Sequence, residues 1–258
     1  MEIEPIYFPD PLLEGVVLER KNPFIMLVDF QGKAVPCHCP TTWHIGNLEV
    51  AGRPCLLSRT GGLERKTPFT VEAVSLDRPE APAKKWIGIN LTAANRYVEY
   101  YLERGGFAKI VGHTSRIHRA RLSGKANLDF VVGSTAIAIK APLLVLGLDV
   151  PPEMRIKTEK PFPSTERFIR RITSLREGLP NCKRAVLITV FLYDHPDFDL
   201  SEYRCYYEEL QPVLERSAAL CLENWQANFI ITKDSVRLDR CLPLQMRTLE
   251  DGTEDKAI

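Results

Sequence analysis

The chain has 258 residues, of which 45% are hydrophobic and 26% are charged, and its formal net charge is +1 at pH 7. This composition is that of an ordinary soluble globular protein, and the length accommodates one large domain or two small ones. No apolar run approaches the roughly 20 residues that a membrane-spanning helix needs, so we expect no such helix. Because the net charge is close to zero, a surface for nucleic acid has to arise from local clusters of basic residues.

The N-terminal segment and the cysteines indicate a cytoplasmic protein. The N-terminal segment is acidic and lacks the basic and apolar regions of a secretory signal. The seven cysteines are scattered and odd in number, which fits reduced thiols better than a disulfide framework. Cys37 and Cys39 flank His38, but no second pair lies at zinc-finger spacing, so we interpret these two residues as buried thiols.

Residues 12–76 are predicted to form a small β domain. Short apolar runs follow one another and are separated by turn-forming pairs such as Gln31-Gly32 and Gly61-Gly62. The runs are 13–18, 24–30, 35–38, 54–57 and 69–74. About five short strands at this spacing are typical of an OB-like barrel. Residues 1–11 are predicted to be irregular, and the polar, proline-bearing segment 77–85 is a predicted linker.

Residues 86–235 have a different pattern, in which strands alternate with helices, and this alternation predicts an α/β domain. Strands are expected at 86–90, 128–132, 136–140, 185–193 and 228–232, and helices at 92–104, 164–178 and 202–223. The run 185–193 is the most apolar and is expected to be a fully buried strand. Residues 236–258 are expected to be a tail whose acidic end is frayed. The predicted fold class is therefore a two-domain α+β or α/β protein.

The strands 128–132 and 136–140 form a predicted hairpin that carries an acid and a base. Asp129 lies on the first strand, and Lys140 ends the second. Metal-dependent nucleases place an aspartate on one strand and a Glu-x-Lys on its partner. The carboxylates hold Mg²⁺, and the lysine steadies the attacking water or the developing charge. Here the position two residues before the lysine is Ala138, which cannot bind a metal.

Basic residues gather at three places, where they are candidates for contacts with backbone phosphates. Arg119 and Arg121 share one face of a segment that is expected to be extended. Three arginines at helical spacing form one face of the helix that begins near residue 164, and four further basic residues lie on the barrel. These seven are Arg167, Arg170, Arg171, Arg20, Lys21, Arg65 and Lys66. Phe24 and Trp43 are candidates for stacking on bases. The competing interpretation is that these are solvated basic faces and core aromatics.

Seven short blocks in order along the chain resemble the sugar fermentation stimulation (SfsA) family. The blocks and their family counterparts are 19–24 for Arg-x-x-Arg-Phe, 38–42 for His-x-Pro-Asn-Thr-Gly, 64–68 for Arg-Lys-x-Pro, 90–96 for Asn-Thr-x-x-x-Asn-Arg, 128–130 for Ile-Asp-Phe, 137–140 for Glu-Val-Lys and 165–167 for Thr-x-Arg. The resemblance covers roughly residues 12–232. No single block is very specific, but their order and spacing are. The Asn-Arg of the fourth block adds Arg96 to the candidates for nucleic-acid binding.

The resemblance implies an N-terminal OB-like domain and a C-terminal PD-(D/E)XK nuclease-like α/β domain with a central mixed sheet. It also implies sequence-non-specific DNA binding and, where the motifs are intact, metal-dependent nuclease activity. This chain departs from the family at three acidic positions. Ala138 replaces the Glu of Glu-x-Lys, Ser164 replaces the Asp of Phe-Pro-Asp, and the family's helix Glu falls at Tyr100, one position after Glu99. The acid cluster is therefore thinned.

The candidate catalytic residues are Asp129, Lys140 and Glu166, and Asp129 is the candidate metal ligand. Glu166 or Glu99 is a candidate for a relocated carboxylate. The alternative for Glu166 is a helix-start acid that the macrodipole favours, and the alternative for Lys140 is a lysine that merely snorkels from a strand end. Mg²⁺ or Mn²⁺ is the expected cofactor if the centre is active, and otherwise none.

The sequence leaves three candidate functions. The first is sequence-non-specific binding of DNA, or of RNA, with a regulatory role in sugar metabolism and a degenerate nuclease centre. The second is an active Mg²⁺- or Mn²⁺-dependent nuclease of DNA or RNA with a relocated carboxylate. The third is a protein-interaction module that retains only the fold. The oligomeric state is left open.

Overall fold

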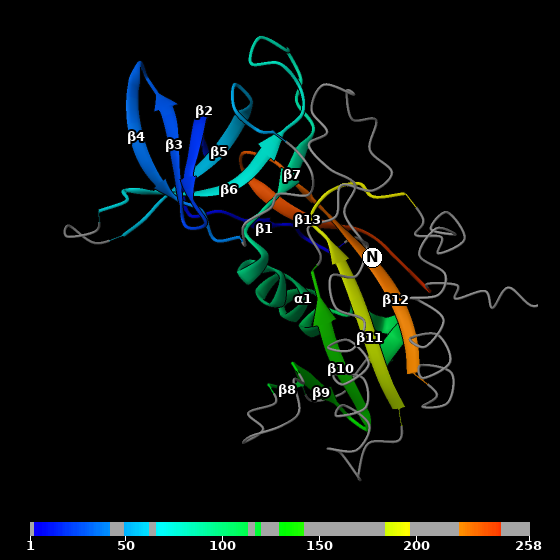
Figure 1. Ribbon diagram of the computed structural model, residues 1–258. Helices are drawn as coiled ribbons and strands as arrows, with labels where there is room; N and C mark the ends of the chain where they lie inside the picture. The colour runs from blue at the N-terminus through cyan, green and yellow to red at the C-terminus, as the bar shows by residue number, and fades with distance from the viewer. Residues whose placement is uncertain are drawn as a thin grey trace, which may run out of the picture.

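The computed structural model describes residues 3–41, 49–61, 66–112, 117–119, 129–141, 184–196 and 222–243 (Figure 1). Within these residues the chain forms two β-sheets and a few short helices. The first sheet has the strand order β4-β3-β2-β5-β6-β7, and the second has the order β1-β13-β12-β11-β10-β9-β8.

The first sheet closes into a barrel because β4 pairs with β3 on one side and, in parallel, with β6 on the other. Its strands are β2 (Leu13–Asn22), β3 (Ile25–Phe30), β4 (Lys33–His38), β5 (Pro54–Arg59), β6 (Phe69–Ser75) and β7 (Trp86–Gly88). The β3–β4 hairpin turns through Gln31 and Gly32, whose φ angles of 55° and 76° are both positive, as a type I′ turn requires. At Gly15 the backbone of β2 approaches β3 so closely that a Cβ atom would lie 2.6 Å from Val28 Cγ1. The predicted OB-like barrel is confirmed.

The barrel core is apolar and includes the cysteines of the first domain. Alternating residues of the strands point inward, among them Val17, Val28 and Val71, which are fully buried. Cys37, Cys39 and Cys55 are free, buried thiols in the same core. Burial raises the pKa of Cys37 to about 11, so this thiol stays protonated at neutral pH. The interpretation of Cys37 and Cys39 as buried thiols is therefore confirmed.

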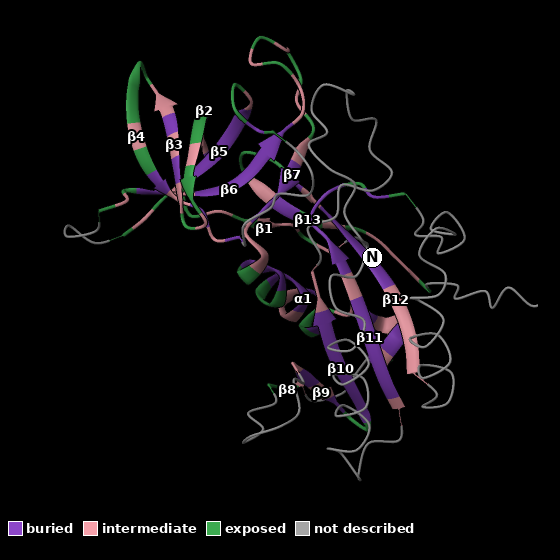
Figure 2. Ribbon diagram, viewed as in Figure 1, coloured by how far each residue is buried: buried purple, intermediate pink, exposed green. Residues whose placement is uncertain are grey.

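The second sheet is mixed, as expected. β10, β11 and β12 run parallel to one another, whereas the flanking strands are antiparallel to their neighbours. Its strands are β1 (Ile6–Tyr7), β8 (Ile117–Arg119), β9 (Phe130–Val132), β10 (Thr135–Lys140), β11 (Arg184–Phe191), β12 (Leu222–Ile231) and β13 (Ser235–Pro243). Parallel strands are usually buried on both faces, and β10 and β11 are buried over most of their length (Figure 2).

One face of the second sheet packs against helix α1. The 3₁₀ turn η1 (Leu91–Ala93) leads into α1 (Ala94–Glu103), and α2 (Ala108–Val111) follows. Tyr97 and Tyr101 lie on the buried side of α1, and their ring centroids are 6.0 and 5.8 Å from that of Phe229 on β12. Ile137 of β10 and Ile188 of β11 belong to the same core. No helix among the described residues is long and apolar enough to cross a membrane.

Several elements differ from the sequence-based expectation. β1 forms within residues predicted to be irregular, because its two residues pair with Val236 and Ser235 of β13. β13 continues to residue 243, where a tail is predicted, and β7 pairs with β6 of the barrel rather than joining the second sheet. β12 begins at Leu222, so the last two residues of the predicted helix 202–223 are strand. The rest of that helix and the predicted helix 164–178 lie outside the described residues.

The two sheets pack directly against each other at β7. The backbone N–H of Gly88 donates to the carbonyl of Leu192, just beyond β11, at 2.8 Å. A Cβ atom on Gly88 would lie 2.4 Å from Ile231 Cδ1 and 2.5 Å from Leu192 Cβ, so only glycine fits this approach. Phe191 and Tyr193 of the second domain are buried in the barrel's core cluster. The junction is therefore a continuous apolar contact.

Candidate functional site

Asp129 is anchored at the start of β9 by contacts on both sides of Ala138. Its backbone N–H donates to the carbonyl of Ile137 at 3.1 Å, and the N–H of Ile139 donates to Asp129 Oδ2 at 2.7 Å. The side-chain amide of Asn95 on α1 donates to the other carboxylate oxygen, Oδ1, at 2.8 Å. Three elements, α1, β9 and β10, therefore fix the direction of this carboxylate.

Ala138 occupies the middle of this arrangement and is an apolar position. Its side chain is 1% exposed, and its partner in the parallel pairing with β11 is Leu187. Ile137 and Ile139 pack in the core that α1 covers, so strand alternation directs Ala138 to the opposite face of the sheet. The methyl group contributes no ligand atom to a cation beside Asp129.

Lys140 ends β10 two residues beyond Ala138 and is partly exposed. Alternation along the strand places it on the same face as Ala138, and it pairs with Thr189 of β11. Asp129 contacts β10 at Ile139, the residue before Lys140. The sequence-predicted acid and base therefore lie at the same end of one hairpin.

Helix α1 presents two polar side chains, Asn95 and Glu99, on one face toward the edge of the second sheet. Residues four apart lie one above the other on a helix. Asn95 binds Asp129, and Glu99 forms a two-pronged ion pair with Arg119, whose Nε and Nη2 both donate to the carboxylate. These hydrogen bonds raise the pKa of Arg119. Arg119 pairs with Phe130, the residue after Asp129. Glu99 is therefore close in the fold to the hairpin, and it is held by Arg119.

One end of the barrel brings three exposed basic side chains together with an exposed aromatic ring. Ile25, which follows the β2–β3 turn, pairs with His38, and His38 pairs with Thr70 near the start of β6. The turn and the start of β6 are thus at the same end of the barrel. We call the exposed side chains here the barrel-end surface, which comprises Lys21, Phe24, Arg59 and Lys66.

The turn that displays Phe24 is well braced. The Phe24 side chain is 64% exposed, whereas its backbone N–H donates to Asn22 Oδ1 at 2.9 Å and its carbonyl accepts from Cys39 N at 2.8 Å. Arg20 Nη2 donates to the carbonyl of Pro23 at 3.0 Å. Arg20, a predicted phosphate ligand, therefore also has a structural role in this turn.

The remaining candidates are distributed as follows. Arg96 is exposed on α1, with its guanidinium carbon 5.5 Å from the centre of the Tyr97 ring. Arg59 and Asn95 are site residues that the sequence did not single out, although Asn95 falls in the Asn-Arg block. Residues outside the described ranges are Trp43, Arg65, Arg121, Glu166, Arg167, Arg170 and Arg171.

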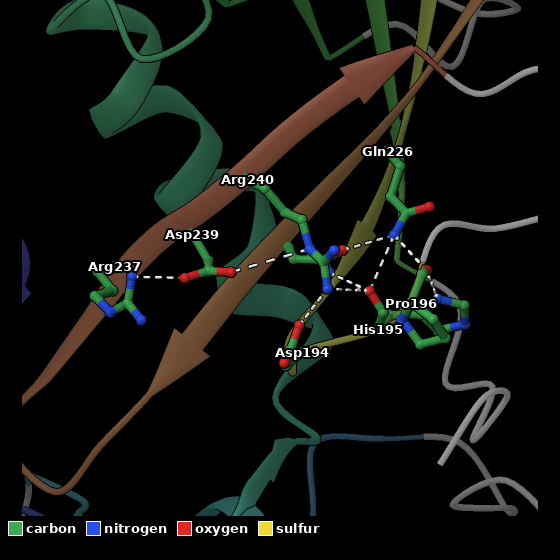
Figure 3. Close-up of polar contacts among 8 residues, drawn as sticks. Asp194, His195, Pro196, Gln226, Arg237, Asp239 and Arg240 are labelled. Atoms are coloured by element: carbon green, nitrogen blue, oxygen red, sulfur yellow. Dashed lines mark hydrogen bonds and ion pairs between the residues drawn. The ribbon is translucent and has the colours of Figure 1, made fainter.

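A buried polar cluster holds the chain where it leaves β11 (Figure 3). The carbonyl of His195 accepts from Asn228 Nδ2 at 2.5 Å and from Arg240 Nη2 at 3.0 Å, and Gln226 Nε2 donates to the carbonyl of Pro196 at 2.9 Å. Arg240 also pairs with Asp194. The His195 ring stacks on Phe191 with centroids 3.8 Å apart. Burial lowers the pKa of His195. These contacts satisfy backbone carbonyls, which indicates a structural cluster.

Comparisons with known proteins agree with the architecture. Residues 18–89 match the family model described as the SfsA N-terminal OB domain. The fold is similar to that of a solved structure described as Pyrococcus furiosus SfsA in complex with Ca²⁺, with a TM-score of 0.68 and 16% sequence identity over 95% of this chain and all of that one.

Sequence relatives carry the same family name. The chain is 30% identical over 212 residues to a sugar fermentation stimulation protein homolog of Methylobacterium radiotolerans, a match that covers 81% of this chain and 84% of the relative. It is 32% identical over 148 residues to a homolog from Synechococcus sp. strain JA-2-3B'a(2-13), of which it spans 59%, and it spans 53% of a Bdellovibrio bacteriovorus homolog. The chain belongs to the sugar fermentation stimulation protein (SfsA) family.

Proposed function

We propose that this chain binds DNA without sequence specificity and that it does so through the barrel-end surface. The observation that carries the proposal is the exposed ring of Phe24 on a braced turn, at the same end of an OB barrel as Lys21, Arg59 and Lys66. Barrels of this type bind nucleic acid by stacking bases on aromatic rings and by attracting the backbone with basic side chains. Contacts to phosphates are the same for every base sequence, so the binding is non-specific.

The salt dependence of this binding can be estimated from the charges. Three cations, Lys21, Arg59 and Lys66, give a slope of log K against log salt of about −2.7 for duplex DNA and about −2.1 for a single strand. Between 50 and 200 mM salt, affinity for duplex should then fall about 40-fold. A steeper slope would require basic residues beyond this surface, and Arg20 in the Phe24 turn and Arg96 on α1 are the described candidates.

The experiment is a fluorescence-anisotropy titration of labelled DNA of unrelated sequences at 50 and 200 mM salt, with RNA of the same sequences in parallel. We expect similar affinities for all DNA sequences, and we expect the affinity for duplex to be about 40-fold lower at 200 mM than at 50 mM salt. Absence of DNA binding at 50 mM salt would contradict the proposal. Binding of RNA but not of DNA would show that the partner is RNA instead of DNA. Binding of neither would favour a protein-interaction module.

We further propose that the nuclease-like centre is degenerate. Among the described residues, no cluster of three or more His, Cys, Asp or Glu side chains is arranged to hold a metal ion. Asp129 is held against the β9–β10 hairpin, and the buried side chain of Ala138 next to these contacts offers no second ligand atom. The described residues therefore do not make up a complete site for Mg²⁺ or Mn²⁺, and we derive no hydrolytic step from them. A regulatory role in sugar metabolism, in keeping with the family name, would act through DNA binding.

The second candidate function is a nuclease with a relocated carboxylate. Glu99 supports it, because this carboxylate is ion-paired with Arg119. Arg119 in turn pairs with Phe130, the residue after Asp129, across β8 and β9. The description of the Pyrococcus furiosus relative, in complex with Ca²⁺, also names a divalent cation. The test is nicking of supercoiled plasmid with Mn²⁺ or Mg²⁺ by the wild type and by the Asp129→Ala and Glu99→Gln variants. Metal-dependent nicking that both variants lose would establish this function, and nicking that neither loses would reject the centre.

A further inference from the structure

A cavity of about 520 Å³ lies between the barrel and the second sheet. One wall comes from the β6–β7 connection and β7, and the other from the segment after β11 and the turn between β12 and β13. Asp77, Lys85, Trp86, Tyr193 and Lys233 are among the residues that line it. Pockets for small molecules commonly have this volume and this position between domains. The cavity lies at the opposite end of β6 from the barrel-end surface, about 20 Å away by the rise of a strand.

The walls of the cavity are held by hydrogen bonds that do not depend on a ligand. Asp77 Oδ2 accepts from Ser75 Oγ at 2.9 Å and from the backbone N–H of Lys85 at 2.7 Å, which fixes the segment before Trp86. On the other wall Asp194 pairs with Arg240 (Figure 3). A site whose shape is set in advance loses little entropy when it binds a ligand.

The charges around the cavity leave an excess of positive charge. Lys84 Nζ and Lys233 Nζ share the carboxylate of Glu14, at 3.0 and 2.7 Å. Burial alone would raise the pKa of Glu14, but the hydrogen bonds from the two lysines outweigh it, so the pKa lies below its ordinary value. Asp194 is matched by Arg240, and the exposed Lys85 adds a further cation against Asp77. Among the residues that line the cavity, three cations, Lys84, Lys85 and Lys233, lie with two carboxylates, Asp77 and Asp194, and this excess of one positive charge suits an anionic group.

The interior of the cavity suits a flat aromatic body. Trp86 is half-buried and Tyr193 is buried, and Ile87, Ile230 and Ile231 supply aliphatic surface beside them. Indole rings stack well on nucleobases, whatever the base. An aromatic interior next to an excess of lysine is the combination that recognises a base joined to a phosphate.

We propose that this cavity binds a nucleotide, with the base beside Trp86 and the phosphate near Lys85 and Lys233. The chemistry is shared by a free nucleoside monophosphate and by the 5′-phosphorylated end of a strand. The cavity is separate from the barrel-end surface, so this proposal goes beyond the DNA binding argued above and stands or fails independently of it.

The experiment is isothermal titration calorimetry of the full chain with AMP, GMP, CMP and UMP, and with the matching nucleosides. We expect at least one monophosphate to bind with Kd below 1 mM and its nucleoside at least tenfold more weakly. Lys85→Glu, an exposed position, should weaken binding at least tenfold, whereas Lys33→Glu, an exposed lysine in the β3–β4 hairpin, should change it less than twofold. Trp86→Leu should remove any change in tryptophan fluorescence on binding.

Two outcomes overturn the proposal: no monophosphate binding at 1 mM to folded wild type, or equal affinity in wild type and Lys85→Glu. Competition by 5′-phosphorylated but not by unphosphorylated oligonucleotides identifies a strand end as the source, and its absence identifies the free nucleotide. Lys85→Glu should keep its affinity for long DNA at the barrel-end surface. A failure of the cavity and a failure of the barrel-end surface are therefore distinguishable.

Discussion

The side-chain amide of Asn95 donates to the carboxylate of Asp129 at 2.8 Å and joins helix α1 to the hairpin of the second sheet. A carboxylate fixed in this way, with Ile139 N–H on its other oxygen, is what a metal centre requires of its first ligand. The second carboxylate is missing, because Ala138 lies between the two backbone positions that Asp129 contacts. The structure therefore has an oriented acid without its partner.

Restoring that partner is the first prediction. In Ala138→Glu a carboxylate returns to the strand position between the two residues that Asp129 contacts, and we expect Mn²⁺-dependent nicking of plasmid DNA above the wild-type level. The matched control is Ala138→Gln, which has the same size and no charge. Because Ala138 is buried, both variants should lose about 1–3 kcal/mol of stability from overpacking, and the Glu variant should lose more because it also buries a charge. Equal nicking by the Glu and Gln variants, or activity that survives an added Asp129→Ala, would contradict the proposed geometry.

Phe24 should contribute more to binding of single strands than of duplex, because only unpaired bases can stack on it. Phe24→Ala should weaken single-stranded DNA binding by about 1–3 kcal/mol, which is roughly 5- to 150-fold, and Phe24→Tyr should retain most of it. The side chain is 64% exposed, so thermal stability should change little. Anisotropy titrations with single-stranded and duplex DNA measure both effects. An equal loss for the two forms would show that Phe24 does not stack on bases.

Glu14 links the two domains, since it lies on β2 and binds Lys233 in the turn between β12 and β13. Its pKa is below the ordinary value of 4.5, so the unfolded chain takes up this proton first as the pH falls. The stabilisation is present above that ordinary value and is lost as the pH falls through the folded-state pKa. Glu14→Gln should cost about 1 kcal/mol at pH 7 and much less at pH 3. Urea unfolding at both pH values measures the difference, with Glu80→Gln on the exposed linker as control. A pH-independent difference would refute the charge-based explanation.

His195 should make the protein less stable in mild acid. Burial lowers its pKa in the folded state, so below about 6.5 the unfolded chain binds a proton that the folded chain does not. Stability should therefore decrease as the pH falls from 7.5 to 5.5, and His195→Phe, which keeps a ring against Phe191, should show a smaller decrease. Denaturant unfolding across this range is the measurement, and His118→Gln at an exposed site is the control. An unchanged pH dependence in His195→Phe would assign the effect to other groups.

Local patterns in the sequence predict the barrel and its β3–β4 hairpin, but they do not predict pairing between strands that are distant in the sequence. The β3–β4 hairpin follows from Gln31-Gly32, whose positive φ angles favour a two-residue turn. β1 has only two residues and exists because β13 pairs with it, and β13 alternates charged and apolar residues beyond the point where a tail is predicted. Such pairs depend on tertiary contacts rather than on local propensity.

Local patterns likewise predict some residues of the candidate site but not others. Asp129 and Lys140 follow from strand pattern and motif, and the structure places them at one end of one hairpin. Asn95 is a helix residue 34 positions before Asp129, and no spacing rule connects the two. Arg59 joins Lys66 only because β5 and β6 pair, with Arg59 opposite Phe69. Contacts between elements therefore determine the part of the site that sequence patterns do not reveal.

The central claim, that the barrel end binds DNA through its charges, is tested most directly by the salt slope of a triple variant. Lys21→Ala, Arg59→Ala and Lys66→Ala together remove three cations from one surface, and Lys33→Ala at the other end of the barrel is the control. Titrations of duplex DNA from 50 to 200 mM salt should give a slope smaller than that of wild type by about 2.7, together with an affinity lower at every salt concentration. A triple variant with the slope and affinity of wild type would contradict the claim.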